Sequence, residues 1–390
     1  MCSGEYLARL LLLLIHMSCV SLSLRVAIRP ASLGSALVGS SSFKSRVLRS
    51  SSRLWSSMAP AFIDTNITTF AAPEEPVDFN KGFKIKRPLG KLQLEILNEH
   101  PIDNKISFDE ENHIYYFNGK QIRHSCTQVV ERYFDKFDPD LAISKMRNGP
   151  RWPRKEYMNY NGTEMTDEEI KGKWDAIGLF ARNKGTWMHY NIELLLNNAT
   201  PNRKMREMAL FESFYNNVII GEAIQPWRTE WRIVAPDLNI AGSIDFVGKN
   251  IDGTYTIIDW KRSKDLANNM NSNFRRSAKK PISHLDDCDG SKYSIQLNMY
   301  RYILQRYYGL KVSGMLLASF HESSTAPFYA PVQPLDSEIE DILADMQQRG
   351  SDNAFDGASM AAFAAPAPAT RDARARPLAP PPTKVMKNPF

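Results

Sequence analysis

The chain has 390 residues, 43% of them apolar, which is enough for one or two packed domains. Its net charge of +6 does not by itself indicate a nucleic-acid partner, because residues 1–63 hold seven bases and one acid while the remaining residues hold 42 of each. Two of the four cysteines lie within residues 1–63, and Cys126 and Cys288 are far apart. This content argues against a disulfide framework, a zinc site or an iron–sulfur cluster and suits a reducing or organellar interior.

Residues 1–63 have the composition of a targeting leader. The apolar run RLLLLLIHMSCVSLSL is followed by a stretch rich in Ser and Arg, and no acid occurs between Glu5 and Asp64. The apolar run is too short to predict a membrane span. A signal followed by a transit region predicts import into a plastid, whereas translation from Met17 would leave a leader of mitochondrial type. A nuclear or cytosolic protein is the alternative if the leader carries no address.

The N-terminal half of the body is expected to form a small hairpin and helical subdomain over residues 105–183, after a loosely structured segment at 64–104. The run ISFDEENHIYYFNGKQI predicts a hairpin around an Asp-Glu-Glu-Asn turn. The next run, SCTQVVERYFDKF, predicts a helix capped by Ser125, with Val129, Tyr133 and Phe137 at helical spacing. Residues 138–183 are predicted to be helical around a polar insertion at 150–169.

The second half is predicted to contain the main domain, residues 184–349. Its pattern is helix (GTWMHYNIELLLN), three strands (EWRIV to IIDWK), helix (KYSIQLNMYRYILQRYYGL) and strand (KVSGMLLASF). The order αβββαβ predicts a mixed sheet flanked by helices, an α/β (α+β) fold. The run LDSEIEDILADMQQ predicts a closing helix, and the Ala/Pro-rich residues 351–390 are predicted to be disordered.

Two aspartates on consecutive predicted strands form the most informative pattern. A two-residue turn at Asp252-Gly253 would put Asp245 and Asp259 on opposite faces of the sheet. A three-residue loop with Gly253 in a left-handed conformation would pair Asn250 with Thr254 and place the two aspartates directly opposite each other. A β-bulge could bring about the same facing. Because opposed like charges destabilise a sheet, the second register predicts a cation between them.

Magnesium, with manganese as the alternative, suits this pair, since Mg²⁺ needs only one or two carboxylates and keeps several waters. Lys261 lies two residues after Asp259, on the same face of the strand. Two carboxylates, a metal and a lysine are sufficient to hydrolyse a phosphodiester. The alternative for an isolated Asp-x-Lys pair is an exposed edge strand with no catalytic role.

Two flanking helices carry further polar pairs at a spacing of four, which places each pair on one helix face. His189 and Glu193 precede the strands, and His189 could add an imidazole ligand to the aspartates. Gln296 and Tyr300 follow the strands. A structural histidine and a polar shoulder on an amphipathic helix are the alternative interpretations.

The segments GTWMHYNIE, GSIDF, IDWK and QLNMY, in this order, resemble the RecB-like branch of the PD-(D/E)xK nuclease superfamily over roughly residues 106–322. The flanking sequence is similar to phage, viral and organellar exonuclease-type members, such as mitochondrial genome maintenance exonucleases. The resemblance implies a restriction-endonuclease-like core and cleavage of DNA that depends on Mg²⁺ or Mn²⁺. It assigns His189, Asp245 and Asp259 as metal ligands and Lys261 as the catalytic lysine. Glu193, Gln296 and Tyr300 match supporting positions.

The sequence departs from the family pattern in two places. The Pro-Asp dipeptide is replaced by Ile244-Asp245, and the clustered cysteines of iron–sulfur members are absent, so no cluster is expected. There is also no phosphate-binding loop of the form G-x-x-x-x-G-K-[ST], so a helicase or polymerase partner would be another polypeptide.

DNA contacts in a neutral body must come from local basic patches. One candidate group follows the catalytic lysine and continues into a polar insertion at 265–292, predicted to be a mobile loop over the site. A second, RWPRK, mixes bases with Trp152, as a surface for stacking single strands would. The six assigned residues are Arg262, Lys264, Arg275, Arg276, Arg151 and Lys155. Ordinary solvated charge is the alternative for both groups.

The sequence thus predicts a metal-dependent nuclease acting on DNA that is single-stranded or has free ends. An exonuclease or flap-processing enzyme in organellar DNA maintenance, replication or repair is favoured over a site-specific endonuclease. A catalytically silent DNA-binding subunit with the same fold and an RNA nuclease are the two alternatives.

Overall fold

The computed structural model describes residues 72–351, apart from 77, 83–84, 86–89 and 272–275. The predicted leader and nearly all of the predicted C-terminal tail lie outside these residues. No helix among the described residues is both long and apolar enough to cross a membrane.

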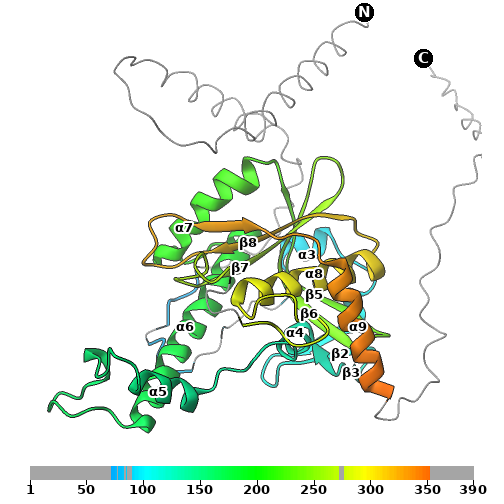
Figure 1. Ribbon diagram of the computed structural model, residues 1–390. Coiled ribbons are helices and arrows are strands. Elements are labelled where there is room, and N and C mark those ends of the chain that lie inside the picture. The colour runs from blue at the N-terminus through cyan, green and yellow to red at the C-terminus, as the bar shows by residue number, and fades with distance from the viewer. Residues whose placement is uncertain (1–71, 77, 83–84, 86–89, 272–275, 352–390) are drawn as a thin grey trace, which may run out of the picture. The chain divides into compact units, whose positions relative to one another are not determined.

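A mixed six-stranded sheet forms the centre of the molecule (Figure 1). One edge of β6 is paired along its length with β5. Its other edge pairs with β4 near the start of β6 and with β7 near its end, and β8 and β9 follow β7 in that order. β7 and β8 run parallel, as do β4 and β6, and the other neighbours are antiparallel. The strands are β4 (His124–Ser125), β5 (Gln225–Ala235), β6 (Ile240–Lys249), β7 (Tyr255–Lys261), β8 (Val312–Ser319) and β9 (Phe328–Pro331).

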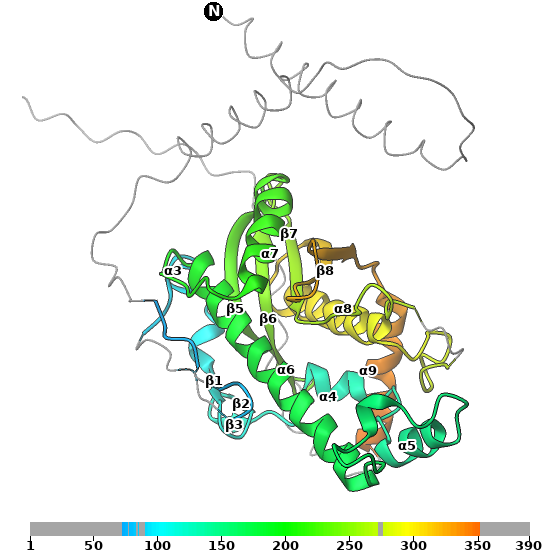
Figure 2. The ribbon, with the colours of Figure 1, turned by 90° about the vertical axis from the view of Figure 1, so that its left-hand side faces the viewer.

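Helices cover both faces of this sheet (Figure 2). One core lies under α8 and α9 and includes Ile244, Ile257 and Ile303, whereas the other lies under α6 and α7 and includes Phe246, Ile258 and Trp260. The predicted order αβββαβ is therefore confirmed, with α6, β5, β6, β7, α8 and β8 in that sequence. The helices are α6 (Asp167–Leu196), α7 (Arg206–Phe214), a π-helical turn η3 (Tyr215–Ile220), α8 (Asp289–Tyr307) and α9 (Asp336–Ser351).

The predicted hairpin and capped helix are present before the sheet. Asp109 pairs with Ile114 around the turn, and the Ser125 side chain and Gln128 form a reciprocal cap. The helix ends at Glu131, so Phe137 lies beyond it with 72% of its surface exposed rather than continuing the buried stripe. The elements are η1 (Asp103–Lys105), β1 (Ile106–Asp109), β2 (Ile114–Phe117), β3 (Lys120–Gln121), α4 (Cys126–Glu131), α5 (Pro139–Arg147) and η2 (Lys155–Tyr157).

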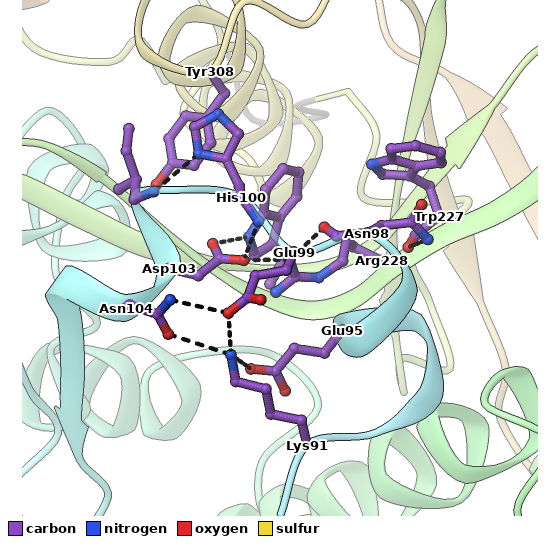
Figure 3. Close-up of polar contacts among 12 residues, drawn as sticks. Lys91, Glu95, Asn98, Glu99, His100, Asp103, Asn104, Trp227, Arg228 and Tyr308 are labelled. Carbon is purple, nitrogen blue, oxygen red and sulfur yellow. Dashed lines mark hydrogen bonds and ion pairs between the residues drawn. The ribbon is translucent and has the colours of Figure 1, made fainter.

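Two expectations about loosely held segments need revision. Part of the segment before the hairpin is anchored to β5 through a buried pair between Asp103 and Arg228, and it contains α3 (Gln93–Leu97) (Figure 3). In the insertion at 265–292, Ala278 and Ile282 are buried in the core beneath α8. The described part of that insertion is thus packed against the body instead of projecting as a free loop.

The boundary expected between residues 183 and 184 falls inside α6, which continues without interruption from Asp167 to Leu196. The N-terminal part of α6 carries α5 at its end, away from the sheet, and its C-terminal part lies along the sheet (Figures 1 and 2). One helix therefore belongs to both predicted regions.

Candidate active site

The loop between β6 and β7 has the three-residue form predicted from the sequence. Asn250 N–H donates to Thr254 O at 2.8 Å, and Gly253 has φ of +81°, which a residue with a Cβ rarely adopts. The resulting ladder pairs Phe246 with Ile258. Continued by one residue, this register sets Asp245 opposite Asp259, so the prediction of the register is confirmed.

The two strands separate at this point. The β6–β7 ladder ends at the Phe246–Ile258 pair, and Asp245 Oδ2 instead accepts a hydrogen bond from Trp260 N at 2.9 Å. Since β5 occupies the other edge of β6, and β4 pairs only with Ile240 and Ala241, residues 242–245 have no strand partner on the β7 side. The aspartates therefore lie at an opening in the sheet.

Strand β5 adds a third carboxylate that the sequence analysis did not assign. Its register with β6 pairs Thr229 with Phe246 and Trp231 with Ile244, which sets Glu230 opposite Asp245. Glu230 itself has φ of +44°, in the left-handed region. β6 is irregular at the same level, since Ile244 and Phe246 pack in different cores although residues two apart on a regular strand share a face. Nothing in the sequence pattern signals this kink.

Helix α6 directs His189 into the same cluster. Its Nδ1 lies 3.3 Å from Glu230 Oε1 and 3.6 Å from Asp245 Oδ1, and 26% of its side chain is exposed. Oxygen and nitrogen atoms of His189, Glu230 and Asp245 all lie within 4.8 Å of one another. Glu193, one turn further along α6, is buried. The spacing of four predicted from the sequence therefore brings both side chains to the inner side of α6.

Lys261 and Asp259 form the other half of the cluster. Lys261 Nζ lies 2.7 Å from Asp259 Oδ2 and 4.7 Å from the centre of the Tyr293 ring on α8. Asp259 Oδ2 is fully buried and is neutralised by this ammonium. Tyr293, like Glu230, was not assigned from the sequence, although its place three residues before Gln296 on α8 could have indicated it.

The pKa shifts of the ionisable groups indicate that negative charge exceeds positive charge in this cluster. Burial, together with the Asp259 and Glu230 carboxylates, raises the pKa of Asp245 to about 7 against the opposing effect of His189. Burial disfavours the charged His189 ring, but Asp245 and Glu230 outweigh it and raise the pKa of His189 to about 9. Burial likewise opposes the Lys261 ammonium, but Asp259 and Asp245 hold its pKa above the ordinary value.

These observations fit a divalent cation. Three carboxylates face two cationic side chains, and burial raises the pKa of one of the carboxyls to about 7. Carboxylate and imidazole atoms are suitable ligands for Mg²⁺ or Mn²⁺. Asp245, Asp259 and His189 would hold such an ion, with Glu230 beside the imidazole.

Helix α8 closes the other side of the site. Gln296 Nε2 donates to the Tyr300 hydroxyl at 2.8 Å, and burial raises the pKa of Tyr300. A Cβ at Gly242 would lie 2.7 Å from the Tyr300 ring, so the glycine permits the helix to approach β6 closely. Gln296 and Tyr300 are therefore joined by a hydrogen bond on the side of α8 that packs against β6, where Asp259 and Asp245 also contribute to the raised pKa of Tyr300.

The basic residues assigned to DNA contact lie in three kinds of environment. The assignment of Arg262 to DNA contact is wrong. Its side chain is 4% exposed, and its Nε donates to the fully buried Glu207 at 2.6 Å, so it stabilises the end of β7 and does not face solvent. Trp152 is also engaged, with Arg147 over its ring and Tyr157 stacked near it. Arg275 lies outside the described residues, whereas the exposed ones are Lys264, Arg276, Arg151 and Lys155.

The mixed sheet, the two aspartates where its strands separate and the adjacent lysine are the features expected of a nuclease. Comparison with known families is specific: the model of the PD-(D/E)XK nuclease superfamily matches residues 161–371, more than half of the chain. The chain therefore belongs to the PD-(D/E)XK nuclease superfamily. No curated protein matches the sequence.

Among solved structures, two similar ones are exonucleases by description. An alkaline exonuclease from Laribacter hongkongensis is 13% identical with a TM-score of 0.25, and the match covers 42% of this chain and 78% of that one. A candidate exonuclease from Eubacterium rectale is also 13% identical with a TM-score of 0.25, and covers 57% of this chain and 68% of that one.

Proposed function

We propose that this protein is a Mg²⁺- or Mn²⁺-dependent deoxyribonuclease that acts at DNA ends or on single strands. The observation that carries the proposal is the separation of β6 and β7 at Asp245 and Asp259, with the Lys261 ammonium beside them. A silent subunit would have no need to keep these charges buried together, since they destabilise the fold unless a ligand neutralises them.

The residues divide into three tasks in this proposal. Asp245, Asp259 and His189 would hold the cation, which when bound supplies a Lewis acid and an activated water. Lys261 Nζ, which lies 2.7 Å from Asp259 Oδ2, would stabilise negative charge developing on the scissile phosphate. Tyr293 and Asp259 restrict where that ammonium can lie.

The choice of DNA with free ends rests on the exposed basic residues and on the family resemblance. The exposed bases Lys264, Arg276, Arg151 and Lys155 suit phosphate contacts without a pattern for reading bases, which favours activity with little sequence preference. The similarity to exonuclease-type family members agrees with action from an end. A helicase or polymerase on another chain would be a suitable partner.

The direct test uses the full chain with end-labelled single-stranded DNA, duplex DNA, circular DNA without ends, and RNA, with Mg²⁺, Mn²⁺ or EDTA. Lys261→Ala should reduce the cleavage rate by about 10²–10³-fold. Lys311→Ala, which removes an exposed lysine just before β8, is the matched control and should cleave like the wild type.

Each alternative has a distinct result. A wild type inactive with both metals on every substrate would indicate a silent subunit, and cleavage of RNA alone would indicate a ribonuclease. Cleavage of circular DNA at the same rate as linear DNA would exclude an obligate exonuclease. A Lys261→Ala protein as active as the wild type would mean that the site is wrongly assigned.

We further propose that residues 1–63 direct the protein to a plastid or a mitochondrion, where it would act in DNA maintenance. Their serine- and arginine-rich composition supports this address. Fusion of residues 1–63 to a fluorescent protein, compared with a fusion beginning at Met17, tests it in cells that contain both organelles. A diffuse cytosolic or nuclear signal from both fusions would contradict it.

A further inference from the structure

Glu230 occupies an unfavourable position on two counts. Its φ of +44° is in the left-handed region, which costs free energy for a residue with a long side chain, although Thr229 and Trp231 on either side remain in the ladder with β6. Its carboxylate is also set opposite that of Asp245, and like charges opposed across two strands destabilise a sheet. A residue of this kind persists where its surroundings hold it in place.

The two neighbours of Glu230 are anchored separately. Thr229 Oγ1 accepts a hydrogen bond from Asn197 Nδ2 at the end of α6, at 2.8 Å. Trp231 Nε1 donates to Asp103 Oδ1 at 2.9 Å, in the segment before the hairpin. With both neighbours held, the backbone of Glu230 is constrained to the kink that turns its carboxylate toward α6.

The kink brings the Glu230 carboxylate next to the His189 ring. Its Nδ1 is flanked by Glu230 Oε1 at 3.3 Å and Asp245 Oδ1 at 3.6 Å. An ionised carboxylate only accepts hydrogen bonds, so a ring nitrogen that faces Glu230 at 3.3 Å is stabilised as a donor. An imidazole that gives up one proton to bind a cation then gives it up from Nε2.

We infer that Glu230 is a positioning residue: it fixes the His189 ring with Nδ1 as hydrogen-bond donor, leaving Nε2 as the ligand atom for the cation. This inference rests on the proposed metal-dependent activity. It assigns the strained backbone of β5 a role at the site, and it distinguishes Glu230 from Asp245 and Asp259, which would contact the ion themselves.

Two substitutions separate positioning from ligation. Glu230→Gln keeps an oxygen that can accept from Nδ1 but removes the charge, whereas Glu230→Gly removes the side chain and relieves the backbone. The affinity for Mn²⁺ is measured by titration calorimetry, and the cleavage rate and melting temperature of each protein are recorded. Ala223→Gly is the matched control, since Ala223 also has a positive φ, of 54°, without contacting the site.

For a positioning residue, Glu230→Gln should retain the Mn²⁺ affinity within about threefold, and Glu230→Gly should weaken it by about 10- to 100-fold. The metal-free Glu230→Gly protein should nevertheless melt about 2 °C higher than the wild type, because the strain is gone. Ala223→Gly should also melt higher while keeping affinity and rate. Lower affinity in a better-folded protein is a result that a merely structural role would not produce.

Other results would overturn the inference. If Glu230→Gln binds Mn²⁺ as weakly as Glu230→Gly, Glu230 is a direct ligand. If Glu230→Gly changes neither affinity nor rate, the residue has no part in the site. A wild type that neither binds Mn²⁺ nor cleaves would overturn the proposed function together with this inference, whereas an active wild type with an unaffected Glu230→Gly protein would overturn the inference alone.

Discussion

Arg228 and Glu230 lie two residues apart on β5, yet they belong to clusters that differ in whether their carboxylates are neutralised by the protein's own donors and cations. The side chain of Arg228 is 5% exposed and pairs with Asp103, which also accepts hydrogen bonds from Trp231 Nε1 and His100 N (Figure 3). Each oxygen of Asp103 has a donor. The acid of this cluster is satisfied without any ligand, although Arg228 Nε has no hydrogen-bond partner among the described residues, and the cluster attaches the segment before the hairpin to the sheet.

The cluster around Glu230 has more acids than cations. Glu230, Asp245 and Asp259 face only the His189 ring and the Lys261 ammonium among the described residues, and burial holds the pKa of Asp245 near 7. Both clusters are buried and both contain carboxylates, so burial alone does not mark a functional site. The distinguishing property is whether the protein's own donors and cations satisfy the acids.

The largest contrast should come from removing one acid from each cluster. Asp245→Asn should lower the cleavage rate by about 10³-fold or more, because a cation ligand worth several kcal/mol in the transition state is lost. Its melting temperature in EDTA should be equal to that of the wild type or higher, since a crowded carboxylate has been neutralised while an oxygen remains for Trp260 N. A marked drop in melting temperature would mean that the cluster is structural.

Asp103→Ala should show the reverse. It leaves the Arg228 guanidinium buried without its carboxylate, which should reduce the free energy of unfolding by about 3–5 kcal/mol. Urea denaturation measures this loss. At a temperature where the variant is folded, its cleavage rate should fall far less than that of Asp245→Asn, because only one of the two anchors beside Glu230 is lost and the Asn197–Thr229 hydrogen bond remains. A loss as large as that of Asp245→Asn would show that Asp103 is needed for the site itself.

Addition of Mn²⁺ should stabilise only one of the clusters. At about 100 times the dissociation constant, an ion that binds the folded state alone adds about 2.7 kcal/mol to the free energy of unfolding. The wild type should gain this amount and Asp103→Ala most of it, whereas Asp245→Asn should gain nothing. Thermal melts with Mn²⁺ and EDTA measure these gains, and an equal gain in all three proteins would indicate binding elsewhere.

The half of the site on β6 and β7 could be predicted because a short loop sets the register of two consecutive strands. If Gly253 is left-handed, the loop has three residues, and the resulting register sets Asp245 opposite Asp259 on the neighbouring strand. Glu230 could not be placed in this way, since its orientation depends on a kink that is held by Asn197 and Asp103, both distant in sequence.

Arg262 was misassigned for the same reason, namely that its contacts depend on distant segments. Arg262 follows the catalytic lysine and resembles a phosphate contact in the sequence, but its partners Glu207 and Glu322 come from remote segments. Periodicity and local motifs identified the core elements, because each helix and strand is encoded by neighbouring residues. Ion pairs between distant segments leave no local pattern.

The loop that made the aspartates predictable provides a smaller effect. Gly253→Ala should cost about 1 kcal/mol, because φ of +81° is strained for any residue with a Cβ. Nothing lies within 4 Å of the added Cβ, so the loss should come from the backbone alone and the register should survive. Cleavage should accordingly remain close to that of the wild type. A large loss of activity would mean that the register has shifted.

The smallest expected effect is a pH dependence of stability in the completed cluster. Burial lowers the pKa of His100, whose Nδ1 accepts a hydrogen bond from Ile102 N and whose ring packs against Tyr308. The unfolded chain therefore binds a proton more readily than the folded protein, so stability is full above the ordinary histidine pKa of about 6.5 and falls as the pH drops through it. His100→Asn keeps an acceptor near Ile102 N but does not titrate, and its melting temperature should fall less than that of the wild type between pH 7.5 and pH 5.5, on the order of 1 °C less. An equal fall in the melting temperatures of the two proteins would show that His100 takes up a proton in the folded state. The cluster would then accommodate a further positive charge, contrary to what its geometry indicates.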